Sequence, residues 1–227
     1  MSPHSKRIGA VILAAGGSSR LGEPKQLIPF RGKTLVRRIV DAAREAGCSP
    51  IIVVIGSDDE KLHRELDRAG VVTVQNKQWQ RGIGSSIRCG IQGLINSSPD
   101  IEASVLLVCD QPAVDVRVIE CLIALRETTG KSIVASSYAD TLGVPALFTR
   151  SVFEELLSLG DKTGAKSIVL RRTERVASLP FPEGQIDIDT REDWEKLDAG
   201  ASLVTTVPTL ANSVSDACVK YVPADRR

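Results

Sequence analysis

The chain has 227 residues, of which 42% are hydrophobic and 25% are charged, a balance typical of a globular protein with a substantial core. Its formal net charge of +1 and its aromatic content of 4% argue against nucleic-acid binding and against a stacking platform for single strands. No apolar run is long enough to span a bilayer, and the N-terminal MSPHSKR lacks the apolar stretch of a secretory signal. We therefore expect a cytoplasmic protein that has no membrane partner.

In chain order, apolar segments alternate with segments of helical periodicity, which predicts a mostly parallel sheet with helices on both faces. Strands are expected at residues 8–14, 50–56, 71–75, 104–110 and 132–137. Helices are expected at residues 35–46, 57–70, 82–95, 114–128 and 150–159. From Asp140 the pattern changes, which predicts a smaller, mixed portion beside the main sheet. Thr190 is expected to cap a further helix, and residues 200–227 have no assignable pattern.

The five cysteines and two histidines form no metal-binding pattern. No cysteine pair has the C-x-x-C spacing, which argues against a structural zinc site. Cys48, Cys109 and Cys121 lie in apolar surroundings, so we expect small core residues in a reducing compartment.

A glycine-rich loop follows the first expected strand, in the stretch AVILAAGGSSRLGEPKQL. Neither the P-loop pattern nor the dinucleotide fingerprint fits it, because the glycines and the lysine are wrongly spaced. The small residues from Ala14 to Gly17 nevertheless leave backbone N–H groups free to approach an anion, and Arg20 and Lys25 bracket the turn with two cations. A generic turn with two surface cations is the alternative.

The stretch LAAGGSSRLGEPKQL resembles the signature L-A-A-G-x-S-x-R-[ML]-G-x-x-K of the MobA-like nucleotidyltransferases. Within that class the chain is most similar to the molybdenum cofactor cytidylyltransferase branch, and the nearby FRGKTLV matches the segment that opens the family's first helix. The resemblance runs from about Ile8 to about Leu197. It implies an α/β fold of three layers, a mostly parallel Rossmann-like sheet of the nucleotide-diphospho-sugar transferase type. One domain is expected over residues 1–199, followed by an extension at 200–227.

The resemblance also assigns roles to this loop. Arg20 and Lys25 are expected to be catalytic and to bind the nucleotide. The remaining nucleotide-binding residues of the loop are expected to be Leu13, Ala14, Ala15 and Gly16. The Ala14-Ala15 pair resembles enzymes that use CTP rather than GTP.

Acidic residues are expected at the same edge of the sheet. Asp110, in VCDQP, follows an apolar strand, so it emerges where ligands of open parallel sheets sit. It is either a Mg²⁺ ligand facing a triphosphate, as in the family's matching motif, or a cap for the next helix. The alternation Ile186-Asp187-Ile188-Asp189 puts both aspartates on one side of an extended segment, opposite the isoleucines. The resemblance favours Asp189 as the second metal ligand, with Asp187 as the weaker candidate; either one could instead be a solvent-facing strand residue.

A third segment, NKQWQRGIGSSIRCG, reads as a turn that enters a helix. Gly82 and Ser85 at the helix start resemble the family's turn that contacts base and ribose. Asn76 is a candidate reader of the base edge, with Gln80 as a second candidate. Trp79 is expected to be structural.

These features together predict an enzyme that uses Mg²⁺ to transfer a nucleoside monophosphate, CMP from CTP as the expected case, onto a phosphorylated acceptor and releases pyrophosphate. Asp110 joins Arg20 and Lys25 as the third expected catalytic residue. The resemblance implies molybdopterin as acceptor, an acceptor-binding portion at about 138–185, and a molybdoenzyme or maturation factor as possible partner. Two stretches of that portion, GVPALF and GDKTGAK, depart from the family's usual GHPxLF and GDxGA[RK].

Three alternatives remain open at this point. The first is a cytidylyl- or uridylyltransferase that acts on a sugar or polyol phosphate. The second is a nucleotide-binding protein that delivers a cofactor without catalysis. The third is a Rossmann oxidoreductase, which the missing fingerprint disfavours.

Overall fold

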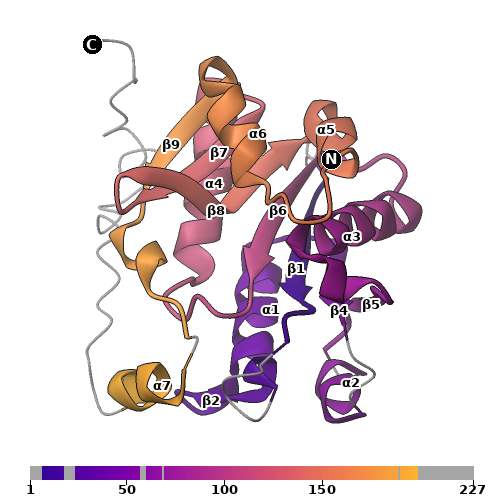
Figure 1. Ribbon diagram of the computed structural model, residues 1–227. Coiled ribbons are helices and arrows are strands. Elements are labelled where there is room, and N and C mark those ends of the chain that lie inside the picture. The colour runs from indigo at the N-terminus through magenta and orange to yellow at the C-terminus, as the bar shows by residue number, and fades with distance from the viewer. Residues whose placement is uncertain (1–6, 18–23, 57–59, 68, 189, 199–227) are drawn as a thin grey trace, which may run out of the picture.

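The computed structural model describes residues 7–17, 24–56, 60–67, 69–188 and 190–198, and these residues build a central sheet between two layers of helices (Figure 1). The sheet has the strand order β5-β4-β1-β6-β8-β7-β9. Its strands are β1 (Ile8–Ala14), β4 (Ile51–Ile55), β5 (Val72–Gln75), β6 (Ala103–Val108), β7 (Ile133–Tyr138), β8 (Thr141–Thr149) and β9 (Val176–Pro180). All neighbouring pairs are parallel except the two that involve β8. The expected fold class is confirmed.

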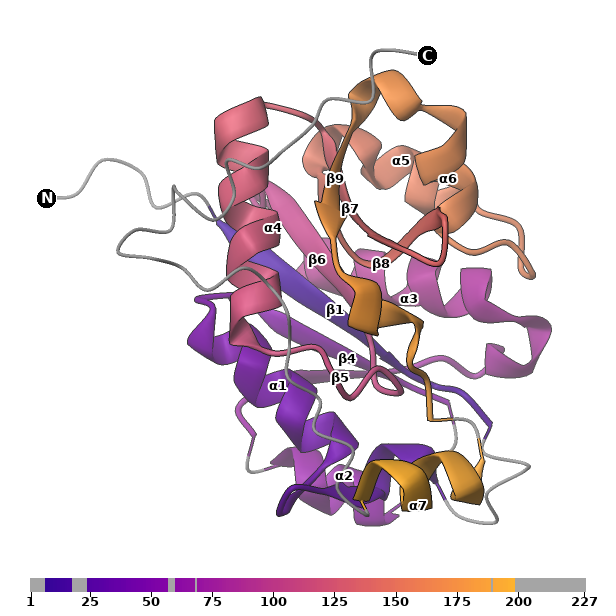
Figure 2. The same cartoon turned by 90° about the vertical axis from the view of Figure 1, so that its left-hand side faces the viewer.

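Helices cover both faces of this sheet (Figure 2). On one face lie α1 (Leu35–Glu45), α2 (Glu60–Asp67) and α4 (Val116–Thr129). On the other lie α3 (Ile83–Ser97), α5 (Phe153–Leu157) and α6 (Lys166–Arg171). A short hairpin of β2 (Pro29–Phe30) and β3 (Lys33–Thr34) and the helix α7 (Arg191–Asp198) lie near the carboxyl edge. Within the described residues, no helix combines the length and apolar character needed to cross a membrane.

The central strands are apolar throughout because side chains on both faces are covered. Along β1, Val11 packs with the α3 side of the core and Ile12 with the α1 side, and neither is exposed. The same alternation holds in β4, where every residue is buried. Strands predicted as apolar runs are therefore the inner strands of the sheet.

The helix ends follow local capping chemistry. The Thr34 side chain accepts a hydrogen bond of 3.2 Å from the backbone N–H of Arg37, so the predicted cap of α1 is confirmed. Asp115 caps α4 in the same way through the N–H of Val118, and the left-handed Gly130 ends that helix. At α7, Thr190 and Asp193 bond each other's backbone N–H groups, a reciprocal cap.

The second half of the chain differs from the expected arrangement. The residues from Asp140 onward do not form a portion beside the main sheet; their strands β8 and β9 belong to the sheet itself, on either side of β7. The chain reverses at Ala139 and Asp140, both with left-handed φ, so β8 runs antiparallel to β6 and β7. The expected helix at 150–159 is a 3₁₀ turn followed by the short α5.

Candidate active site

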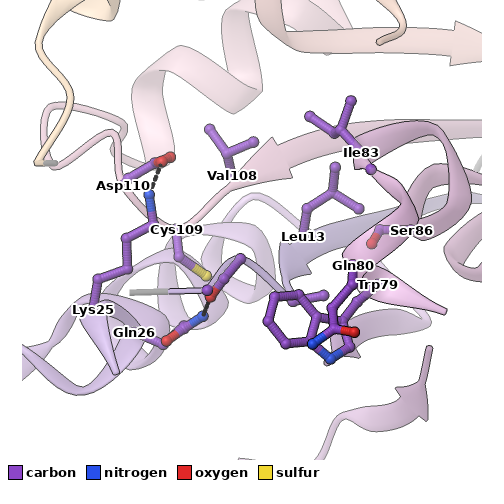
Figure 3. Close-up of a pocket in the computed structure, with 14 residues that line it drawn as sticks. Leu13, Lys25, Gln26, Trp79, Gln80, Ile83, Ser86, Val108, Cys109 and Asp110 are labelled. Carbon is purple, nitrogen blue, oxygen red and sulfur yellow. Dashed lines mark hydrogen bonds and ion pairs between the residues drawn. The ribbon is translucent and has the colours of Figure 1, made fainter. Parts of the chain in front are cut away.

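The carboxyl ends of β1 and β6 and the start of α3 meet at one edge of the sheet and enclose a cavity of about 290 Å³ (Figure 3). Because β1 and β6 are parallel neighbours, the loops that follow them emerge side by side. The residues that line the cavity are Leu13, Ala15, Gly16, Gly17, Lys25, Gln26, Trp79, Gln80, Gly82, Ile83, Ser86, Val108, Cys109 and Asp110.

An ion pair crosses one end of this cavity. Lys25 Nζ lies 2.5 Å from Asp110 Oδ2, although the two residues are 85 positions apart in the chain. Their side chains are 17% and 22% exposed, so the pair is largely shielded from water. The structure thus brings together a cation of the glycine-rich loop and the carboxylate at the end of β6, as the strand-end argument predicts.

Gln26, which the sequence did not single out, fixes the position of Lys25. Its side chain is buried, and Nε2 donates hydrogen bonds of 2.5 Å to the Ala14 carbonyl and 3.1 Å to the Gly16 carbonyl. The 3₁₀ turn Lys25–Leu27 is thereby tied to the loop after β1. Only the polar character of Gln26 within the motif could have indicated this, because the contact itself is not local.

Trp79 packs under the glycine-rich loop and lines the far end of the cavity from Asp110. A Cβ added to Gly17 would lie 2.9 Å from the indole Cζ3, and one on Gly56 would lie 2.7 Å from Cγ. Both positions therefore need glycine to accommodate the ring. Trp79 has the expected structural role and also contributes to the cavity wall.

Asn76 lies beneath the first turn of α3, which contains Ser85, and neither residue lines the cavity. Asn76 is buried; its Nδ2 donates to the hydroxyls of Ser85 and Ser86 at 2.9 and 3.0 Å, and its Oδ1 accepts from the N–H of Gln78. Gly82 and Ser86 do line the cavity. The base-reading role of Asn76 stays a prediction, while its contacts fix the start of the helix.

Two of the predicted site residues, Asp189 and Arg20, lie outside the described residues. The backbone N–H of Ile188 donates to the Asp110 carbonyl at 2.9 Å, so the segment that contains Asp187 meets the chain just after β6. Asp187 is exposed and Ile188 fully buried, in line with the predicted alternation. Among the described residues, no group of three or more His, Cys, Asp or Glu side chains gathers as a metal site.

Gln111, the next residue of the CDQP stretch, ties this edge to the second half of the chain. It is buried, and its Nε2 donates to the Gly184 carbonyl at 2.7 Å. Nearby, burial raises the pKa of Tyr138, and the negative charges of Asp187 and Asp110 add to the rise. The Gln111 side chain therefore joins the end of β6 to the segment around Gly184.

Cys109 lies in the cavity wall, and its side chain is buried. Burial first, and then the charge of Asp110, raises the pKa of its thiol far above the usual value. A thiol that keeps its proton at neutral pH is a weak nucleophile. Covalent catalysis by cysteine is thus disfavoured in this cavity.

Residues 10–176 match the model of the MobA-like NTP transferase domain. The chain belongs to this family. Its fold is also that of Rv0371c from Mycobacterium tuberculosis H37Rv, with a TM-score of 0.72 and 32% identity over 87% of this chain and all of that one. Another structure of the same protein is a complex with manganese and matches with a TM-score of 0.66 and 28% identity, over 86% of this chain and 99% of that one.

Curated relatives are matched over shorter stretches. The nicotine blue oxidoreductase of Paenarthrobacter nicotinovorans is 31% identical over 117 residues, 51% of this chain and 55% of that protein. The bifunctional protein GlmU of Pelobacter propionicus is 28% identical over 131 residues, 56% of this chain and 28% of that protein. The chain therefore matches about half or less of these relatives' length, and their activities do not transfer directly.

Proposed function

We propose that this MobA-like protein transfers a nucleotidyl group from a nucleoside triphosphate, with CTP as the donor, to a phosphorylated acceptor. In this reaction a phosphate oxygen of the acceptor attacks the α-phosphorus, the bond from that phosphorus to the bridging oxygen breaks, and pyrophosphate leaves. The observation that carries the proposal is the Lys25–Asp110 pair, set in a cavity between the glycine-rich loop and the start of α3.

The charges of the site suit a triphosphate. Lys25 and Arg20 supply positive charge, and the bare backbone of the loop supplies N–H donors for the charge that develops on the reacting phosphorus and the leaving group. A phosphate monoester is already anionic at neutral pH, so the acceptor needs no general base.

The donor set at Asp110 fits a hard divalent cation. The carboxylate faces the cavity and already holds a cationic group, the Lys25 ammonium. Mg²⁺ takes one or two carboxylates and completes its shell with water and phosphate oxygens. Asp110, with Asp189 as the second ligand, would therefore suffice to hold it. When bound, the ion would offset the charge of the β- and γ-phosphates. Lys25 would then move from Asp110 to a phosphate oxygen.

The acceptor is proposed to bind in the 138–185 portion, whose residues reach the cavity edge through Gln111 and Gly184. Molybdopterin, which carries a terminal phosphate, is the proposed acceptor, and a molybdoenzyme or its maturation factor is the proposed partner. Gly143–Phe148 and Gly160–Lys166 depart from the resembled branch in this same portion. A sugar or polyol phosphate is therefore the acceptor to test beside it.

The test is a panel of the four NTPs with Mg²⁺ or Mn²⁺ against molybdopterin and a set of sugar and polyol phosphates, scored by pyrophosphate release. We expect Lys25→Ala to lower kcat/KM about a thousandfold, because a cation that stabilises the transition state is lost. Asp110→Asn should raise the metal concentration needed for half-maximal rate. Lys33→Ala is the matched control, since Lys33 is an exposed lysine of the neighbouring hairpin that pairs with Asp41 at 2.7 Å.

Equal turnover by Lys25→Ala and the wild type would refute the assignment. Tight NTP binding without pyrophosphate release from any acceptor would favour a delivery protein instead.

One relative favours a second candidate, an oxidoreductase, because the nicotine blue oxidoreductase is 31% identical to this chain over the matched stretch. Titration with NADH and NADPH separates the two candidates. The nucleotidyltransferase proposal expects no saturable binding of either dinucleotide at the cavity, and competition between NADPH and CTP would support the second candidate.

A further inference from the structure

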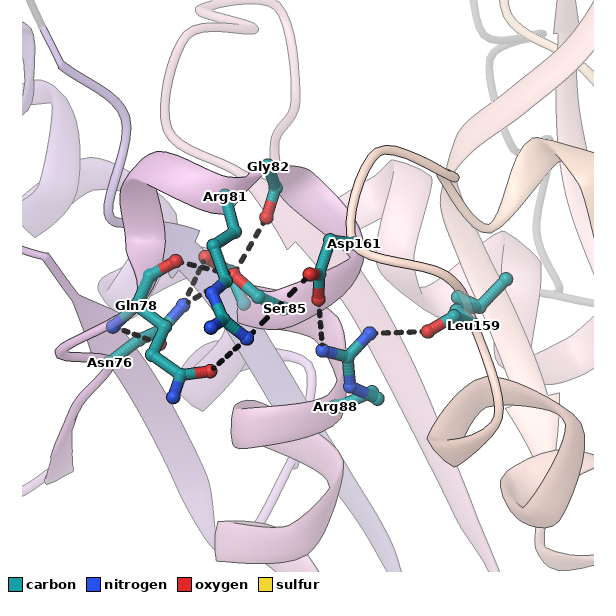
Figure 4. A network of polar contacts seen from close by, with 9 residues as sticks. Asn76, Gln78, Arg81, Gly82, Ser85, Arg88, Leu159 and Asp161 are labelled. Carbon is teal, nitrogen blue, oxygen red and sulfur yellow. Dashed lines mark hydrogen bonds and ion pairs between the residues drawn. The ribbon is translucent and has the colours of Figure 1, made fainter.

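A loop from the second half of the chain, residues 160–164, is seated on the first turn of α3 (Figure 4). The N–H of Gly84 donates to the Asp161 carbonyl at 2.8 Å. A Cβ on Gly84 would overlap the carbonyl oxygen of Gly160, and one on Gly82 would lie 2.6 Å from that of Asp161. The two backbones approach so closely that both helix positions need glycine.

An arginine on the next turn of α3 holds this loop in place. The Arg88 guanidinium donates to the Leu159 carbonyl and to the Asp161 carboxylate, while Arg81 lies 3.9 Å from the other carboxylate oxygen. The side chains of Arg88 and Asp161 are 28% and 37% exposed. Two guanidinium nitrogens thus bind the start of the loop and its acid, a fixed geometry that a lysine would not reproduce.

The turn on which the loop sits is also a wall of the nucleotide cavity. Gly82, Ile83 and Ser86 line that cavity, whereas no residue of 159–164 does. Asp161 therefore contacts the wall from outside and would not touch a bound nucleotide. It contacts the start of α3, and the position of that turn sets the width of the cavity at the end opposite Asp110.

We propose that Asp161 is a positioning residue for nucleotide binding, and that its pair with Arg88 couples the 138–185 portion to the nucleotide cavity. The inference rests on the proposed function, because it concerns the nucleotide that the cavity takes. Since coupling between two sites is reciprocal, an acceptor that shifts the 160–164 loop changes nucleotide affinity, and a nucleotide changes acceptor affinity by the same factor.

A pair that only stabilised the fold would behave differently from one that positions the wall. Glu155 and Arg175 supply the comparison, since their ion pair of 3.0 Å is similarly exposed, at 34% and 30%, lies in the same half of the chain and contributes no residue to the nucleotide cavity. Loss of either pair should lower thermal stability. Only loss of the Asp161 pair should weaken nucleotide binding.

The experiment compares Asp161→Asn, Asp161→Glu and Arg88→Gln with Glu155→Gln, measuring Tm, the Kd for CTP with Mg²⁺ by calorimetry, and kcat and KM for CTP. We expect Asp161→Asn and Arg88→Gln each to raise Kd and KM about tenfold with little change in kcat, because a charge-assisted contact to the wall is lost. The double variant should be no worse than either single one, and Asp161→Glu should recover part of the affinity.

Unchanged Kd and KM in Asp161→Asn, with a fall in Tm like that of Glu155→Gln, would overturn the inference and leave the proposed function standing. A wild-type protein that binds no nucleoside triphosphate at all would overturn the proposed function and this inference with it.

Discussion

Lys25 reaches Asp110 because the residue that follows it is anchored. Gln26 donates two hydrogen bonds from one buried amide nitrogen to the carbonyls of Ala14 and Gly16, at the two ends of the bare-backbone stretch. The same amide therefore shapes the loop and places the 3₁₀ turn that carries the lysine. The Gln26 side chain thus links the glycine-rich loop, which is proposed to bind phosphate, to Lys25, the proposed catalytic cation.

Replacing Gln26 with glutamate tests this anchor. A carboxylate cannot donate, so its oxygens would face two carbonyl oxygens in a buried site, and we expect a loss of about 1–3 kcal/mol in the free energy of unfolding. Activity should fall as well, because Lys25 loses its position. Urea unfolding and initial rates provide the measurements. Gln92→Glu is the matched control, since Gln92 makes an exposed helical contact with Asn96 at 2.9 Å and should tolerate the change.

The buried thiols give a prediction on pH. Burial raises the pKa of Cys48 to about 12 and raises that of Cys109 as well, where Asp110 adds to the effect. The folded protein keeps these protons to higher pH than the unfolded chain, whose thiols titrate near 8.5. The resulting stability is complete below that pH and declines as the pH rises above it.

Thiol labelling followed by mass spectrometry checks the same pKa shifts. At pH 8 we expect Cys89, which is only partly buried, to react before Cys48 and Cys109. The Asp110→Asn variant should lower the pKa of Cys109 by removing a neighbouring negative charge. Rapid modification of Cys109 in the native wild type would contradict the assigned burial.

At the scale of elements, two glycines of α3 show how closely this helix packs on the sheet. Gly90 faces the sheet so closely that an added Cβ would overlap Val11 and lie 2.9 Å from Val54, both of which have no exposed surface. Gly93 faces Val74 at 2.8 Å, but Val74 is partly exposed on the short edge strand β5 and can shift. The two glycines occupy the same helix under different constraints.

Alanine at each position should separate these constraints. Gly90→Ala is expected to destabilise the protein by about 1–3 kcal/mol, because extra volume is forced into a closed core. Gly93→Ala should be near neutral, because a gain of up to about 1 kcal/mol in helix propensity offsets a small shift of Val74. Chemical denaturation of both variants measures the difference. Equal effects would mean that the core around Gly90 yields as easily as the edge.

How far the sequence predicts this fold depends on which strands are considered. The inner parallel strands β1, β4 and β6 are readable because burial on both faces leaves continuous apolar runs. The strand β8 is not, because it contains Gly143 and Pro145 and pairs antiparallel across a register shift at Ala135 and Ser136. Its pairing with β7 is a local hairpin, but its other partner, β6, precedes α4 and β7 in the chain, and composition does not reveal that pairing.

The same distinction between local features and distant contacts applies to the residues of the candidate site. Lys25 and Asp110 could be placed at one edge of the sheet because loop composition and a strand-end position are local features. Leu13, Ala15 and Gly16, which the family resemblance assigns to nucleotide binding, line the same cavity, whereas Ala14 does not, and their binding roles stay predictions. Three tertiary contacts could not be predicted, because each joins segments that are distant in sequence: the hydrogen bonds of Gln26, the packing of Trp79 against Gly17 and the contact of Asp161 with α3. Motifs indicated the chemistry, while the residues that hold it in place emerged from tertiary contacts.

At the scale of the molecule, the continuous sheet joins the proposed nucleotide and acceptor portions. The pairing of β6 with β8 and of β7 with β9 carries backbone hydrogen bonds from the core of the first half to the far edge of the second. Gln111 and Arg88 add side-chain links from each side of the cavity to Gly184 and Asp161. Without the pairing of β6 with β8, each of these two strands would have an unpaired edge.

The protein should consequently unfold in one transition. We expect the Tm from far-UV circular dichroism to coincide with that from Trp79 fluorescence in a Trp194→Phe variant, since the cavity wall and the far sheet edge share one core. CTP with Mg²⁺ at a hundred times its Kd should move both midpoints together, by about 5–10 °C, because a ligand that binds only the folded state adds about 2.7 kcal/mol. Two separate midpoints, or a shift in the fluorescence midpoint alone, would show that β7–β9 unfolds independently of the nucleotide cavity.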